Sequence, residues 1–388
     1  MKKTTNLIQG GRKAMSAPKT VNLPVTRAST VVFENMAELE AVQKRFDSDE
    51  VVPTYGILNM PLRAAFEELM VEIEGGYRAS TFGSGLAANA AALLACVKAG
   101  DHVLMVDSVY GPTRRLCDRT LRRLGVETTY YDPLVGESIA AHLKPNTRVV
   151  YLESPGSHTF EVQDVPAIAR VAKSHGAVVI MDNTWATGLY FPAFEYGVDL
   201  VVQAGTKYPA GHSDLLIGTV VANKEWWPRL RDFARDLGQT ASPDDIFLAV
   251  RGIRTLEVRL KRHEQSALTV ARWLQARPGI ARVLHPALET DPGHALWKRD
   301  FKGSTGLFAI EFPKATTKAQ VAAFIDHLDC FALGYSWGGY ESLAVVAYWS
   351  RSARPWTGGP LVRLQIGLED PEDLMADLER GLARMKAA

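Results

Sequence analysis

The sequence predicts an α/β protein, with a mostly parallel central sheet covered by helices and a smaller C-terminal α+β domain. Two observations support this fold class. After about residue 60, short apolar runs rich in β-branched residues alternate with segments of helical periodicity. Continuous apolar strands that alternate with helices are typical of a parallel sheet buried on both faces. Beyond about residue 254, one long helical segment is followed by a strand and a final helix.

The first 57 residues look irregular, and "ASTVVF" (28–33) is their only strand-like run. A long stretch of this kind often reaches across to a neighbouring subunit. Apolar residues at helical spacing then predict a helix over 60–74 that stops at a Gly-Gly pair. Strands are predicted at 102–107, 126–132, 148–155, 177–183, 199–205 and 217–223, with a helix at 165–176. We therefore expect an N-terminal arm (1–57), an α/β domain (58–253) and a C-terminal α+β domain (254–388).

Composition excludes several classes of function. The chain has 388 residues, of which 47% are hydrophobic and 22% charged, as in ordinary globular proteins. A net charge of +1 predicts no electrostatic partner such as nucleic acid. Three scattered cysteines form no disulfide framework, and no run of about 18 apolar residues predicts a membrane span. We expect a soluble cytoplasmic protein that binds neither nucleic acid nor membrane.

Two charged side chains stand at the ends of predicted buried strands. Lys207 follows "DLVVQAGT", and desolvation there would lower its pKa and make its amine a nucleophile. Such a lysine forms a Schiff base with a carbonyl group of a substrate or of pyridoxal phosphate. Asp182 closes "VVIMD", and a buried carboxylate needs a cationic or donor partner. A protonated pyridine nitrogen is such a partner, so the pair favours pyridoxal phosphate over a lone snorkelling lysine and a helix-capping aspartate.

A glycine loop precedes an alanine-rich helix in "FGSGLAANAA". The free N–H groups at that helix start, around Ser84 and Gly85, are suited to binding a phosphate. The same residues also match a dinucleotide fingerprint, with Asp107 at the end of the next strand as the ribose-binding acid. A nicotinamide-dependent oxidoreductase is therefore the alternative from another enzyme class.

Several other residues carry weaker signals. Tyr110 follows the Asp107 strand and is placed to stack on a cofactor. Thr206 is placed to donate to phosphate. Arg363 stands alone in an apolar run and is placed to bind a carboxylate. Arginines recur between 114 and 123, where a solvated helix face is favoured over a nucleic-acid site. The dispersed histidines show no metal-ligand spacing.

Together the stretches "FGSGLAANAA", "HVLMVDSVYGPTRR", "VVYLESPGS", "VVIMDNTWA", "QAGTKYPAGHSD" and "GYSWGGYESL" resemble the Cys/Met-metabolism family of pyridoxal-phosphate enzymes. The resemblance covers nearly the whole chain. It implies the type I fold of pyridoxal-phosphate-dependent transferases. "SWGGYESL" is similar to the β-lyase branch, which implies a carbon–sulfur lyase acting on cystathionine in methionine biosynthesis.

The resemblance also implies roles for individual residues. Lys207 would hold the cofactor covalently, Asp182 would pair with the pyridine nitrogen, and Tyr110 would stack on the ring. The phosphate would lie at Ser84, Gly85 and Leu86, near Ala204 and Thr206, and would be reached by Tyr55 of a neighbouring subunit in a homotetramer. The substrate carboxylate would be bound by Arg363 and Ser336, with Tyr335, Trp337 and Ser157 nearby.

The chain departs from the family pattern in the arm. Relatives usually show Tyr-x-Arg, with the arginine reaching the phosphate across the interface, whereas this chain has Tyr55-Gly56-Ile57. Ala204 also stands where many relatives carry a serine. Two alternatives therefore remain open on the same cofactor: a lyase for cysteine or its conjugates, and an amino-acid racemase.

Overall fold

The computed structural model describes residues 1–11 and 20–388. Its larger sheet has the strand order β1-β7-β6-β5-β4-β2-β3. Strands β2 to β6 run parallel to one another, and β7 pairs antiparallel with β6 and β1. The predicted mostly parallel sheet is confirmed. The strands are β1 (Arg78–Phe82), β2 (His102–Val106), β3 (Glu127–Tyr131), β4 (Thr147–Glu153), β5 (Val178–Asp182), β6 (Leu200–Gln203) and β7 (Gly218–Ala222).

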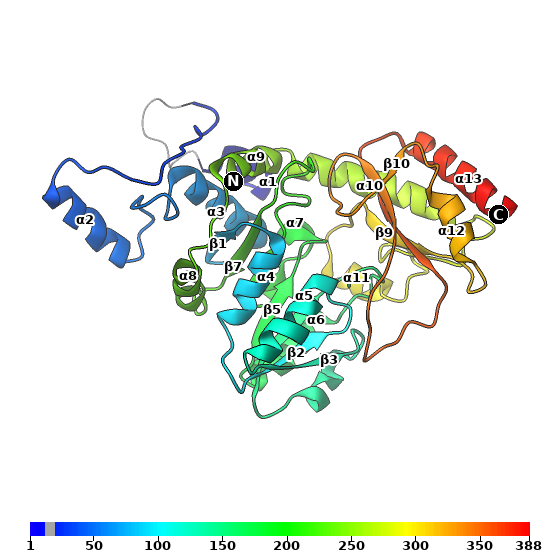
Figure 1. Cartoon of the computed structure of the whole chain (residues 1–388), viewed down its shortest axis with the longest axis horizontal. Coiled ribbons are helices and arrows are strands. Elements are labelled where there is room, and N and C mark those ends of the chain that lie inside the picture. The colour runs from blue at the N-terminus through cyan, green and yellow to red at the C-terminus, as the bar shows by residue number, and fades with distance from the viewer. Residues whose placement is uncertain (12–19) are drawn as a thin grey trace.

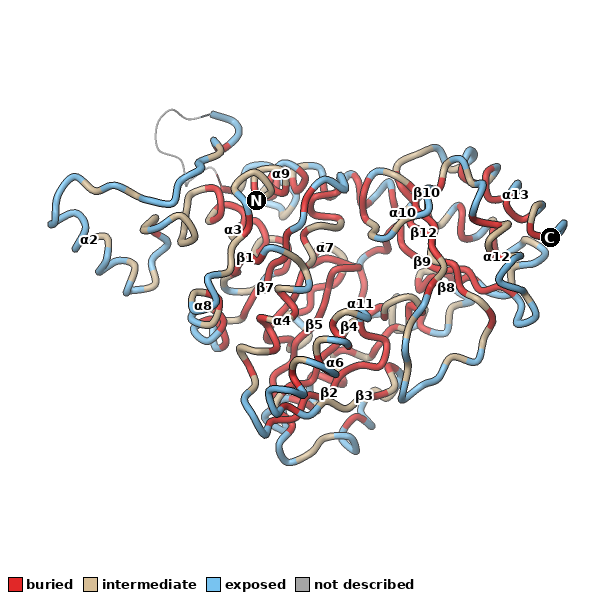
Figure 2. The backbone as a smooth tube through the Cα atoms, viewed as in Figure 1, coloured by how far each residue is buried: buried red, intermediate tan, exposed pale blue. Residues whose placement is uncertain are grey.

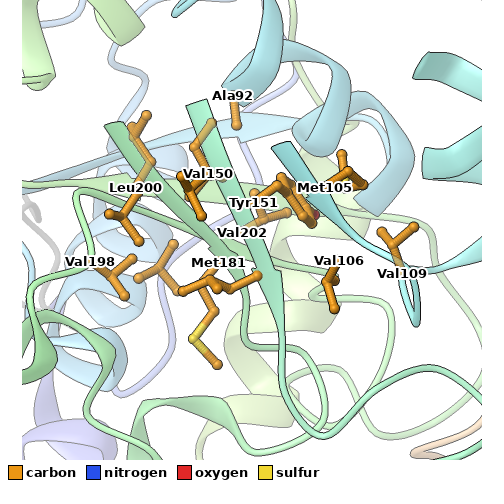
Figure 3. Packing of buried hydrophobic residues seen from close by; sticks show 14 of the residues in the cluster. Ala92, Met105, Val106, Val109, Val150, Tyr151, Met181, Val198, Leu200 and Val202 are labelled. Atoms are coloured by element: carbon orange, nitrogen blue, oxygen red, sulfur yellow. The ribbon is translucent and has the colours of Figure 1, made fainter. Parts of the chain in front are cut away.

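Helices enclose this sheet (Figure 1). Helix α4 (Gly85–Leu94) lies against β5, β6 and β7, and α3 (Pro61–Glu74) packs on β1 and β7. Every residue of β2 and β5 is buried, as their continuous apolar sequences require. Side chains such as Met181 and Val202 pack together between the layers (Figure 3). The other helices of this part are α5 (Gly111–Arg115), α6 (Val165–Ser174), α7 (Thr187–Tyr190), α8 (Trp227–Asp236) and α9 (Pro243–Ile253).

The C-terminal part forms a second sheet with the order β10-β11-β12-β9-β8. The expected long helix is α10 (Leu256–Gln275), and the expected final helix is α13 (Pro371–Ala387). Their apolar faces join the sheet in a separate core that includes Leu274, Phe308 and Leu378. The remaining elements are β8 (Arg282–Leu284), α11 (His294–Asp300), β9 (Leu307–Glu311), α12 (Lys318–Ile325), β10 (Phe331–Leu333), β11 (Ser342–Val346) and β12 (Leu361–Gln365).

The N-terminal arm differs from the expected irregular chain. It contains α1 (Lys3–Gln9) and α2 (Met36–Asp47), while "ASTVVF" forms only an isolated bridge from Thr30 to Tyr55. Asn35 caps α2 by accepting a hydrogen bond from Glu38 N–H, a local signal that the sequence analysis missed. Helix α2 projects from the body and has no buried residue (Figure 2). Residues 12–19 of the predicted arm lie outside the described residues.

A long loop, residues 347–360, joins β11 to β12 and returns to the larger sheet. Its backbone N–H groups at Ser352, Ala353 and Arg354 donate to the Asp107 carboxylate at 2.9–3.0 Å. Arg114 also binds this carboxylate and lies over the Tyr130 ring. We refer to residues 347–360 as the strap. It connects the two sheets at the end of β2.

Candidate active site

Polar side chains gather at the carboxyl ends of the parallel strands, where ligands bind in open α/β sheets. After β6 the backbone turns, and Lys207 N–H donates to the carbonyl of Ala204 at 3.0 Å. The Lys207 amine donates to Ser336 Oγ at 2.6 Å and lies 5.4 Å from the centre of the Trp337 ring. Two segments that are 129 residues apart in sequence therefore meet at this amine.

The environment of Lys207 makes the neutral form of its amine more accessible. Burial and the nearby Arg363 guanidinium together lower the pKa of Lys207 to about 8, against the opposing charge of Asp182. A desolvated lysine beside another cation is the usual form of a nucleophilic amine. Lys207 thus has the chemistry expected of a residue that captures an aldehyde.

Asp182 ends β5 with its carboxylate held on both oxygens. One oxygen accepts from Thr184 N–H at 3.0 Å and from Thr184 Oγ1 at 2.5 Å, and the other accepts from Asn89 Nδ2 at 3.2 Å. Burial raises the pKa of Asp182, although these hydrogen bonds and Lys207 counteract it. A carboxylate in this state is stabilised by an additional cationic partner.

The predicted anion site is the start of α4. Ser84 caps the helix by accepting from Ala87 N–H, and the first N–H groups of the helix, at Gly85 and Leu86, have no partner within the helix. A Cβ added at Gly85 would lie 2.6 Å from Ala204 Cβ, so the backbone approach at this point requires glycine. Thr206 lies in the same turn, but its hydroxyl bonds to the backbone of Ile217 in both directions. Those bonds compete with the phosphate contact expected of Thr206.

The C-terminal part supplies the other side of the candidate site. Arg363 on β12 donates from Nη2 to the Ser336 carbonyl at 2.9 Å, and burial lowers its pKa to about 10. Ser336 has φ +78°, which turns the loop toward Lys207. A Cβ at Gly338 would lie 2.8 Å from Tyr208 N, so this loop packs directly on the lysine backbone. Tyr335 is 85% exposed and lies at the rim.

Tyr110 and Ser157 lie beside this pocket on the loops after β2 and β4. Tyr110 N–H donates to Glu153 Oε2 at 2.7 Å, and its side chain is 44% exposed. Ser157 N–H donates to the carbonyl of Ser108 at 2.8 Å. Burial raises the pKa of Tyr110, with Asp182 and Glu153 adding to the shift. The tyrosine is therefore neutral and half open to a ligand.

Tyr55 lies on the N-terminal arm and is 50% exposed. Its predicted contact is with a neighbouring subunit, so it stays a prediction. The Ile57 carbonyl, at the position of the missing arginine, accepts from Arg63 of α3. Arg63 is itself paired with Glu67 at 2.9 Å. The backbone at Ile57, where the chain departs from the family pattern, is thus held in place by Arg63.

Sequence reasoning missed the residues that hold the Asp182 carboxylate, whereas it placed Glu153, which accepts from Tyr110 N–H, at the carboxyl end of a strand. Asn89 is the lone polar residue in an apolar helix, and Thr184 follows Asp182 at the spacing of an Asx turn, so both had a detectable signal. Glu153 pairs in register with Asp182 on the adjacent strand. Burial raises its pKa well above the usual value, and the Asp182 charge adds to this shift.

The dinucleotide alternative is wrong in its residue assignment. Asp107 is 1% exposed and is saturated by the strap and Arg114, so it has no capacity left for a ribose. The expected solvated face of arginines is also wrong at Arg114, which is buried in this ion pair.

Within residues 1–11 and 20–388, no group of three or more potential ligand residues is arranged to hold a metal ion. No helix in the same described part is long and apolar enough to cross a bilayer.

The residues present fit pyridoxal phosphate. The Lys207 amine, with its lowered pKa, matches the aldehyde of the cofactor. The buried Asp182 carboxylate, with its raised pKa, matches the ring nitrogen. The start of α4, where only glycine fits, matches the phosphate. The fold and the site therefore define a type I pyridoxal-phosphate enzyme.

Comparison with known proteins gives the family. The family model described as "Cys/Met metabolism PLP-dependent enzyme" matches residues 4–383, and the chain belongs to this family. Cystathionine beta-lyase of Salmonella typhimurium is 44% identical over 98% of both chains, and cystathionine beta-lyase MetC of Escherichia coli is 43% identical over 98% of both. The crystal structure of cystathionine gamma synthase from Xanthomonas oryzae pv. oryzae in complex with aminoacrylate and cysteine matches with a TM-score of 0.91 and 31% identity, over 100% of this chain and 99% of that chain.

Proposed function

We propose that the protein is a carbon–sulfur lyase that converts L-cystathionine and water into homocysteine, pyruvate and ammonia. One observation carries the proposal: the Lys207 amine, Ser336 and Arg363 form one continuous contact chain at 2.6 and 2.9 Å. The nucleophilic amine and the carboxylate-binding cation are therefore placed to act on the same bound amino-acid substrate. The two bacterial relatives named as cystathionine beta-lyases support this choice of substrate.

When bound, pyridoxal phosphate supplies an aldehyde that captures the substrate amine and a ring that withdraws electrons from Cα. Arg363 and Ser336 would bind the substrate α-carboxylate and orient the Cα–H bond. Lys207 Nζ, released by the incoming amine, would take the Cα proton. Either Lys207 or Tyr110 would supply a proton to the departing thiolate sulfur. Trp337 covers the amine and would exclude water from it.

The remaining cofactor contacts are part of the same proposal. Asp182 would stay ionised against the ring nitrogen, and Tyr110 would stack on the ring. Ser84, Gly85 and Leu86 would bind the phosphate, with Ala204 and Thr206 in the adjacent turn. Ser157, Tyr335 and Trp337 would line the substrate side.

The oligomer and the setting are also proposed. The projecting arm, in which α2 has no buried residue, suits contact with a second copy, and Tyr55 would complete that copy's phosphate site in a homotetramer. We assign the arm to 1–57, the cofactor domain to 58–253 and the C-terminal domain to 254–388. The setting is the cytoplasm, in methionine biosynthesis, with no nucleic-acid or membrane partner.

The test uses purified holoenzyme. The wild type should show a visible absorbance band that Lys207→Ala abolishes and that the exposed-lysine control Lys224→Ala retains. Titration with L-cystathionine should release pyruvate and homocysteine in equal amounts. Retention of the band in Lys207→Ala would overturn the assignment of the lysine.

A panel of substrates separates the related reactions. Pyruvate from L-cysteine or its conjugates but not from L-cystathionine would replace the proposed substrate. Conversion of an L-amino acid to its D form without pyruvate, seen by chiral chromatography, would indicate a racemase instead.

A further inference from the structure

Glu74, the last residue of α3, is a buried carboxylate with a full set of donors around it. It is 2% exposed. Oε2 accepts from Asn183 Nδ2 at 2.9 Å, while Oε1 accepts from Gln203 Nε2 at 2.9 Å and from Gly188 N–H at 3.1 Å. Hydrogen bonds to a buried charged group are among the strongest in a protein. The three donors come from segments separated from Glu74 by more than 100 residues.

The partners of Glu74 adjoin the two residues that define the cofactor site. Asn183 directly follows Asp182, and Gln203 ends β6 directly before the turn that carries Lys207. Asn183 is also fixed by its own backbone, because its N–H donates to the carbonyl of Val202 at 3.0 Å. The Glu74 carboxylate therefore bridges the ends of β5 and β6 behind the cofactor pocket.

The charges around Glu74 are few. The Lys3 amine of α1 donates to the carbonyls of Ile73 and Gly188 at 2.7 and 3.2 Å, which places a cation beside the carboxylate. Glu72, Glu195 and Lys302 act on Lys3 from further out. Burial raises the pKa of Glu74 to about 7, while the three donors and Lys3 oppose the shift. The carboxylate changes its charge in the neutral pH range.

We propose that Glu74 is a positioning residue for the cofactor: its carboxylate ties Asn183 and Gln203 together and so fixes the placement of Asp182 against Lys207. It acts through these neighbours and does not touch the cofactor. Glu74 accepts hydrogen bonds only from N–H donors, while the oxygens of two of these donor amides, Asn183 Oδ1 and Gln203 Oε1, have no hydrogen-bond partner. A neutral amide in its place therefore either forces one of these amides to turn over or leaves two N–H groups facing each other.

The direct test is Glu74→Gln in the holoenzyme, with Glu68→Gln as the matched control because Glu68 is exposed on the same helix. The variant should release pyridoxal phosphate about tenfold faster than the wild type, as expected from the loss of one charge-assisted contact. It should lower kcat with little change in KM, since the substrate contacts are untouched. Glu68→Gln should match the wild type in each measurement.

A pH titration separates positioning from simple packing. The visible circular dichroism of the bound cofactor should change with a midpoint near pH 7 in the wild type, and Glu74→Gln should lack this change. Lys3→Met keeps the carboxylate but removes its neighbouring cation, so it should move the midpoint to higher pH. A titration and a cofactor release rate in Glu74→Gln equal to those of Glu68→Gln would overturn the proposal.

Gln203→Met serves if Glu74→Gln does not fold. It keeps the side-chain volume and removes one of the three donors, so it should speed cofactor release in the same direction by a smaller factor. Unchanged release and an unchanged titration in Gln203→Met would equally contradict the proposal. These readouts concern the cofactor alone, so they are independent of whether L-cystathionine is the substrate.

Discussion

Asp107 and Asp182 end two strands of similar sequence, "HVLMVD" and "AVVIMD", yet they lie in opposite electrostatic states. Burial alone would raise the pKa of Asp107, but the N–H groups of Arg354 and Ser352 and the Arg114 guanidinium lower it below its usual value. Asp182 has fewer donors and no arginine, so burial wins and its pKa is raised. One carboxylate is satisfied by the protein, and the other is left with capacity for a cation.

The difference teaches that a strand-end aspartate is a ligand site only where the protein leaves it incompletely paired. The strap uses Asp107 as an anchor between the two sheets. Asp182 instead has a raised pKa, and a bound pyridinium group would stabilise its charged form. Five measurements can break or sharpen this contrast.

The largest expected effect is that of Asp182→Asn. The amide keeps the volume but removes the charge that balances the ring nitrogen, so kcat/KM should fall about 10²–10³-fold, as for the loss of a preorganised electrostatic contact. Thermal stability should not fall, because a costly buried charge is removed. Steady-state kinetics and a melting curve measure both, with Asp107→Asn run in parallel. A kcat/KM of Asp182→Asn within fivefold of the wild-type value would refute the contrast between Asp182 and Asp107.

The rate of cofactor loading should follow the charge of Lys207. Only the neutral amine attacks an aldehyde, and its pKa is about 8. Covalent attachment of pyridoxal phosphate to apoenzyme should therefore speed up about tenfold per pH unit below pH 8 and level off above it. Stopped-flow absorbance measures the rate. A plateau that begins only near pH 10 would mean that the lysine is not desolvated.

Asp107→Asn should reduce stability and leave the chemistry largely intact. Loss of the charge beneath three N–H groups and Arg114 should cost about 2–4 kcal/mol of unfolding free energy. The control is Asp132→Asn, whose partner Arg354 is exposed and whose effect should stay below about 1 kcal/mol. Denaturant titration gives both values.

The pH dependence of stability should differ in the same variant. The lowered folded pKa of Asp107 contributes stability above its unfolded pKa of about 3.9, and this is lost as pH falls through the folded value. Asp107→Asn should therefore unfold less steeply with acid than the wild type. Asp182 has the opposite sign, because its raised folded pKa reduces stability as pH rises. Parallel acid unfolding curves for Asp107→Asn and the wild type would refute the assignment.

The smallest expected effect is that of Glu153→Gln. Burial and the Asp182 charge raise the pKa of Glu153 well above its usual value and disfavour its charged form, so an amide that also accepts from Tyr110 N–H should keep kcat within about threefold of the wild type. Glu153→Ala removes that acceptor and should lower kcat about tenfold, because the tyrosine loses its anchor. The pair is compared by steady-state kinetics. Equal losses in both variants would show that the charge of Glu153 is used.

Local pattern was enough to predict most elements and the central pair. The apolar runs before Asp182 and Lys207 predicted buried strands, and the structure has them as β5 and β6. The arm was harder: Met36, Leu39, Val42 and Phe46 of α2 recur at helical spacing, but the helix buries no residue against the rest of the chain.

By itself the sequence determined where strands end and which polar side chains follow them, since a buried strand must be apolar and its end must be polar. It placed Asp182 in the candidate site, but it could not say how either Asp107 or Asp182 is held, because their partners come from residues 352–354 in one case and from Asn89 and Thr184 in the other. Only the tertiary structure decided the opposite pKa shifts of the two carboxylates, because these shifts depend on donors brought to each carboxylate through space.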